Sequence, residues 1–98
     1  MNYEKILTRP DKSKVKITVS ITTRYGGLVF NWGIDVETKQ PRKRNWIPVI
    51  DAYLKWCSID ARDAFILSKQ LEYVTKDEIK QAKLEFLETL KKQVEDEA

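Results

Sequence analysis

The sequence predicts an α+β fold in which a three-stranded antiparallel meander over residues 14–50 is followed by two or three helices packed on one face. Apolar and polar residues alternate on both sides of a glycine pair, and the apolar spacing changes to a helical period after Ile50. A chain of 98 residues can bury one modest core. Residues 1–98 are therefore expected to form a single domain.

The clearest strand signal covers residues 14–24, where every second residue is apolar: Val15, Ile17, Val19 and Ile21. Gly26-Gly27 can adopt the positive φ angles of a tight turn, and the alternation resumes over residues 28–36. These two runs predict a β-hairpin.

The segments on either side of this hairpin carry weaker signals. Residues 1–13 are expected to form an irregular basic segment. After a polar loop over residues 37–43, residues 44–50 are expected to form a third strand. Because Pro48 lacks an N–H group, that strand is expected at a sheet edge.

The helical part is expected over residues 51–94. Residues 51–57 predict a short helix, and Ser58 can cap a second one. Thr75-Lys76-Asp77-Glu78 matches a capping box, which marks the start of a third helix. One face of this helix is apolar up to about residue 94, with Trp32 and Trp56 expected in the core beneath the helices. Residues 95–98 are expected to be a frayed acidic tail, since acids repel the negative end of the helix dipole.

Composition excludes several function classes. The chain has no histidine and a single cysteine, Cys57, so catalytic triads, thiolate zinc sites and internal disulfides are excluded. We therefore predict a non-enzymatic protein without cofactor or metal. A lone thiol favours a reducing, cytoplasmic location, and the charged N-terminal segment predicts no membrane insertion.

One motif resembles a catalytic site. Glu37-Thr38-Lys39 has the Glu-x-Lys form of a class of metal-dependent nucleases. In a chain of 98 residues with 15 acids and 13 lysines this spacing is expected by chance, and Glu78-Ile79-Lys80 repeats it in the third helix. The motif therefore does not predict a nuclease.

The basic charge is concentrated in the first half of the chain. Residues 1–50 contain ten Lys and Arg residues against four acids, and residues 51–98 contain eight against eleven. On the polar face of the first strand lie Lys14, Lys16 and Arg24, and the 39–46 loop adds Lys39, Arg42, Lys43, Arg44 and Trp46. Cations of this kind can contact phosphates, and an exposed aromatic ring can stack on a base.

These eight residues predict a nucleic-acid-binding module for DNA or RNA. The alternative is an inhibitor or adaptor that binds an acidic protein surface, and a merely solvated sheet face would carry similar residues. Trp46 is open to two interpretations, because it shares strand parity with Ile50, which favours the core, yet it adjoins the basic run.

Overall fold

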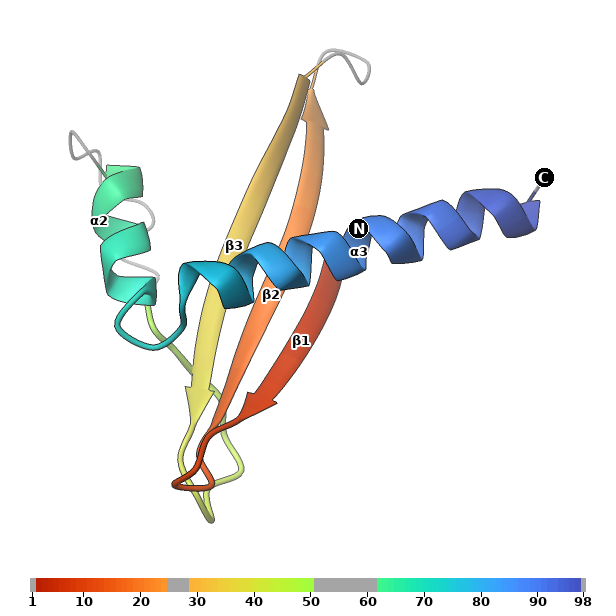
Figure 1. The fold of residues 1–98 in the computed structure, drawn as a ribbon. Coiled ribbons are helices and arrows are strands. Elements are labelled where there is room, and N and C mark those ends of the chain that lie inside the picture. Colours follow the sequence, from red (N-terminus) through yellow and green to blue (C-terminus); the bar gives the residue numbers. More distant parts are fainter. Residues whose placement is uncertain (1, 25–28, 51–61, 98) are drawn as a thin grey trace.

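The computed structural model describes residues 2–24, 29–50 and 62–97 and has an α+β architecture (Figure 1). Four antiparallel strands lie in the order β1 (Asn2–Thr8), β2 (Lys14–Arg24), β3 (Val29–Lys39) and β4 (Ile47–Pro48), and two described helices follow, α2 (Arg62–Gln70) and α3 (Lys76–Glu97). The helix expected over residues 51–57, the Ser58 cap, Trp56, Cys57 and the Gly26-Gly27 turn lie outside the described residues. No helix within the described ranges is long and apolar enough to cross a membrane.

The N-terminal segment forms β1 (Asn2–Thr8), so the expectation of an irregular segment over residues 1–13 is wrong for most of its length. β1 pairs with β2 (Lys14–Arg24) along its whole length. Tyr3, Lys5 and Leu7 point toward the helical layer, while Ile6 on the opposite face is 53% exposed. The inward lysine hides the alternation in the sequence, and it is accommodated because its ammonium group bonds the Glu85 carboxylate on α3.

The predicted hairpin is present as the pairing of β2 with β3 (Val29–Lys39). Val15, Ile17 and Val19 are buried on one face, as their alternation predicts, and Val36 of β3 joins them. Trp32 differs from the expectation of a core residue. It meets Phe86 edge-on at a centroid distance of 6.3 Å, and this contact leaves the Trp32 side chain 41% exposed.

The expected strand over residues 44–50 is reduced to β4 (Ile47–Pro48), a two-residue edge strand. Pro48 lies opposite Glu37, and the Val49 N–H donates to the Val36 carbonyl at 2.9 Å. The proline ring cannot extend the ladder, which limits the strand to its predicted edge position.

The helices are α2 (Arg62–Gln70) and α3 (Lys76–Glu97). Thr75 and Glu78 form the predicted capping box, with the Thr75 N–H donating to Glu78 Oε1 at 2.9 Å and the Glu78 N–H to Thr75 Oγ1 at 3.1 Å. α3 extends to Glu97, beyond the predicted end near residue 94, so the acidic tail is helical rather than frayed up to that residue.

α3 crosses one face of the sheet, and α2 lies beyond the β3 edge (Figure 1). The core fills the space between α3 and the sheet, with Ile79, Ala82 and Phe86 packed on the β2 and β3 residues. The Gln70 side chain, which is buried, donates to the Ile34 carbonyl at 2.8 Å and holds the end of α2 against β3. The opposite face of the sheet is left without a covering helix among the described elements.

Candidate functional site

Two turns lie side by side at one end of the sheet (Figure 1). The first joins β1 to β2, where the Lys12 N–H donates to the Arg9 carbonyl at 2.9 Å and the Arg9 N–H donates to the Ser13 carbonyl at 2.8 Å. Pro10 sets the φ angle of a type I turn, and Lys12 follows with a φ of 72°. This is the three-residue hairpin in which the residue after the turn adopts the left-handed conformation.

The second turn follows β3. The Lys43 N–H donates to the Gln40 carbonyl at 3.1 Å, and Arg42 has a φ of 66°. Because Pro41 cannot adopt a positive φ, a positive φ at the next residue defines a type II turn. The turn directs the run Arg42-Lys43-Arg44 toward the β1–β2 turn.

Between the two turns lies a depression of about 350 Å³. Its charged lining residues are all cations, and we call it the cation depression: Lys12, Lys14, Lys39, Arg42, Lys43 and Arg44, with Gln40 and Pro41 completing the wall. Five of the six cations are exposed, and Lys39 is half-buried. None of the six forms a salt bridge with any residue that the structure describes.

The nearest acid in the two turns is Asp11, which does not line the cation depression. Its carboxylate accepts the Ser13 N–H at 2.9 Å and the Ser13 hydroxyl. These hydrogen bonds lower the pKa of Asp11, so the carboxylate is charged but turned into its own hairpin.

Trp46 lies beside the cation depression, outside the hydrophobic core cluster. The Lys16 ammonium is 4.5 Å from its ring centroid and the Lys39 ammonium is 5.6 Å away, both within cation–π range. Lys16 and Lys39 come from the helix-free face of the sheet, so Trp46 packs on that face. Of the two interpretations of Trp46, the structure favours the one outside the core.

The structure brings together most of the predicted binding residues. Lys14, Lys39, Arg42, Lys43 and Arg44 line one depression, and Lys16 and Trp46 adjoin it. Arg24 is separated from them, since it ends the 11-residue β2 that Lys14 begins, a backbone separation of about 33 Å in a strand.

Lys12 is a lining residue that sequence reasoning missed. Pro10-Asp11 is a typical turn pair and could have indicated a turn before Lys14. This turn joins two strands of a hairpin only if residues 2–8 are also predicted to form a strand. Without β1, nothing in the sequence placed Lys12 beside the 39–46 loop.

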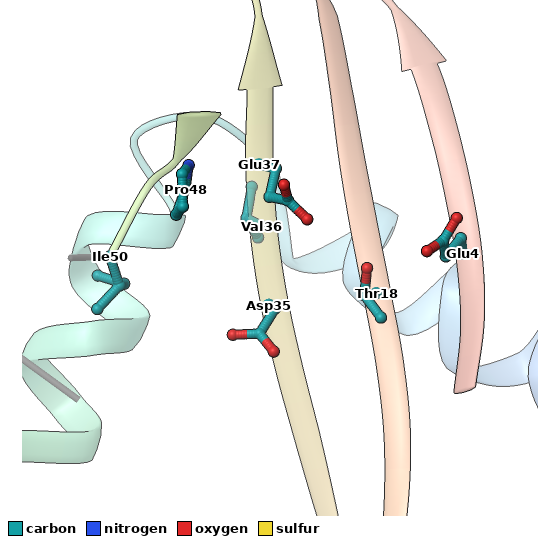
Figure 2. Close-up of a pocket in the computed structure, with 7 residues that line it drawn as sticks. All are labelled: Glu4, Thr18, Asp35, Val36, Glu37, Pro48 and Ile50. Atoms are coloured by element: carbon teal, nitrogen blue, oxygen red, sulfur yellow. The ribbon is translucent and has the colours of Figure 1, made fainter. Parts of the chain in front are cut away.

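The helix-free face is not basic along its whole length. Paired residues on β2 and β3 change from Lys14 opposite Lys39 to Lys16 opposite Glu37, and then to Thr18 opposite Asp35. Figure 2 shows the carboxylates of Glu4 on β1 and of Asp35 and Glu37 on β3, the two strands that flank β2, around a pocket of about 300 Å³, which Thr18 and Pro48 also line. The basic character of this face is therefore confined to the end that carries the two turns.

Among the residues that the structure describes, no group of three or more acidic or thiol side chains is placed to hold a metal ion. Asp35 shares the parity of Asn31 and Gly33 in the second predicted strand, whereas Glu37 was expected in the polar loop over residues 37–43. Glu4 could be added only once β1 was known.

Comparisons with protein-family models, with curated proteins and with solved structures found no match to this chain.

Proposed function

We propose that this protein is a small non-enzymatic module that binds nucleic acid through the cation depression and Trp46. The observation that carries the proposal is six cations lining one depression without an acid among its lining residues. Lys14 and Lys39 stand directly opposite each other on β2 and β3, an arrangement that is unfavourable for like charges. A polyanion bound at this end of the sheet would relieve that repulsion.

Nucleic acid fits the chemistry of the cation depression. Exposed lysine and arginine side chains bind phosphates by charge and by hydrogen bonds to the phosphate oxygens, and binding gains from the release of condensed counterions. Trp46 offers an aromatic surface at the rim, where a base could stack, and its neighbours Lys16 and Lys39 would hold the adjoining phosphates.

The acidic pocket limits how far a bound nucleic acid can extend along the sheet. Glu4, Asp35 and Glu37 lie on the same face just beyond Lys16, and their carboxylates would repel a phosphate backbone running along the strands. The nucleic acid is therefore expected to cross the end of the sheet rather than follow it. Seven phosphate contacts at most, from the six cations and Lys16, would give a slope of log K against log salt of about −5 for a single strand and about −6 for a duplex.

The test is fluorescence anisotropy with labelled single-stranded DNA, duplex DNA and RNA over a range of salt concentrations. Replacing Arg42, Lys43 and Arg44 together by alanine should reduce the salt slope by about two to three units for every sequence alike. Stability should change little, because exposed cations contribute little to folding.

A matched control comes from α3. Lys80, Lys91 and Lys92 are also exposed, and none of them lines the cation depression. Their triple alanine variant changes the net charge by the same amount and should bind like the wild type. Equal losses in the two triple variants would indicate a non-specific charge effect and contradict the proposed site.

The alternative partner is an acidic protein surface, which the same cations could contact in an inhibitor or adaptor. An interface with an apolar anchor depends less steeply on salt than phosphate binding does. If the wild-type protein binds none of the three nucleic acids at low salt, the nucleic-acid proposal is wrong and the protein partner becomes the hypothesis to test.

A further inference from the structure

Lys12 and Arg42 share an unusual backbone conformation. They are the two residues other than glycine with a positive φ in the described part of the chain, at 72° and 66°. A left-handed conformation is unfavourable for a residue with a Cβ atom, and long charged side chains are not among the residue types that adopt it readily.

Each of them occupies a position where its turn favours glycine. In the β1–β2 hairpin the residue after the type I turn is normally glycine or asparagine, and Lys12 stands there. In a type II turn the residue after Pro41 is normally glycine, and Arg42 stands there. Local turn chemistry therefore explains neither side chain.

The two turns are about thirty positions apart in the sequence, but both residues line the cation depression. In the described residues, this type of strain is thus confined to one site. Strained backbone tends to persist at functional sites, where the side chain is required for another reason. Lys12 comes from the β1–β2 turn and Arg42 from the turn after β3, so each of the two turns brings one of these residues to the depression.

We propose that Lys12 and Arg42 form a clamp that holds one phosphodiester segment between the two turns, and that their side chains are kept for this contact at the expense of turn stability. The clamp rests on the proposed nucleic-acid function and adds to it the residues that grip the backbone. It also predicts an inverse relation between stability and affinity at two defined positions.

The test compares glycine with alanine at each position. Lys12→Gly and Arg42→Gly remove both the cation and the strain, whereas Lys12→Ala and Arg42→Ala remove the cation alone. Each glycine variant should have a melting temperature at or above that of the wild type and clearly above that of its alanine partner. Lys12→Arg should retain binding.

Binding to labelled oligothymidine and to a labelled duplex is measured with the same variants. Each loss of a phosphate contact should weaken binding at 0.1 M salt by roughly fivefold for oligothymidine and roughly eightfold for the duplex, and reduce the salt slope by about one unit. The glycine and alanine variants of one position should bind equally weakly, because both lack the cation.

A double variant of Lys43 and Arg44 to alanine separates the clamp from the proposed function. If this variant binds weakly while both glycine variants bind like the wild type, the cation depression is the binding site but the clamp is wrong. Glycine variants that melt below the wild type would also overturn the clamp, because the two positions would then not be strained. If the wild-type protein binds neither probe, the proposed function is wrong, and the clamp with it.

Discussion

Eight of the ten cations of the N-terminal half belong to two regions with different surroundings. On the β1 side, Lys5 bonds Glu85, and the Arg9 guanidinium bonds Glu78 through two contacts of 2.7 and 2.9 Å and the Tyr73 carbonyl through a third of 2.9 Å. In the cation depression, six cations have no acid partner among the described residues. The side chains are chemically alike, but the first group joins β1 to α3 and the second remains available to a ligand.

The difference also appears in the ionisation of the paired groups. The hydrogen bonds from Arg9, with support from the Thr75 cap, lower the pKa of Glu78 to about 2, and the same carboxylate raises the pKa of Arg9. Burial and the neighbouring Glu85 raise the pKa of Tyr3. A lysine or arginine in this sequence is therefore evidence of a binding site only if it does not form an ion pair that stabilises the fold, as Lys5 and Arg9 do.

The largest expected effect is on stability, at the cations that are paired with acids of α3. Arg9→Met removes three hydrogen bonds that connect β1 to the start of α3, and should lower the free energy of unfolding by about 2–3 kcal/mol. Urea unfolding measures the loss. Nucleic-acid affinity of the folded variant should match the wild type, since Arg9 does not line the cation depression. A large loss of affinity with unchanged stability would reverse the roles assigned to the two regions.

The pH dependence of stability should show the same ion pair. Because the folded-state pKa of Glu78 is about 2 and its ordinary value is 4.5, the unfolded state binds more protons between these values. Its contribution of about 2 kcal/mol is complete above pH 4.5 and is lost as the pH falls toward 2.

Glu78→Gln is the control for this pH effect, because glutamine can keep the capping box but carries no charge. The difference in unfolding free energy between the wild type and this variant should be full near pH 6 and approach zero near pH 2. A difference that stays constant over this range would show that the charge of Glu78 does not contribute.

The next effect is at the rim of the cation depression. Trp46→Ala should weaken binding to single-stranded nucleic acid by about 1–3 kcal/mol, since stacking on a base would be lost. Trp46 lies outside the core, so the free energy of unfolding should fall by no more than about 1–2 kcal/mol. Thermal unfolding and anisotropy measure the two quantities. A loss of about 4 kcal/mol in the free energy of unfolding without a change in affinity would show that Trp46 stabilises the fold and does not contact the nucleic acid.

The smallest expected effect is on affinity, where the basic end of the sheet meets the acidic pocket. Glu37→Gln removes one carboxylate opposite Lys16, at the edge of the basic end of the sheet. Affinity should rise by about two- to threefold at low salt, and the gain should disappear at high salt as screening takes over. A decrease in affinity would show that Glu37 positions Lys16 instead of limiting the footprint.

Much of the local structure could be predicted from the sequence. The alternation of β2 and β3, the α3 capping box and the edge position of Pro48 depend on residues within a few positions of one another. The strand pattern also predicts the loop after β3, and for this reason five of the predicted binding residues line one depression.

The tertiary structure decided which of these charges are neutralised. An inward Lys5 contradicts a strand pattern until Glu85, eighty residues away, is brought to it, and Arg9 looks like a binding cation until Glu78 reaches it. Similarly, Lys12 and Arg42 become neighbours only because antiparallel pairing brings two turns to one end of the sheet. Sequence patterns report short-range preferences, whereas ion pairing and the shape of a depression depend on contacts between residues far apart in the chain.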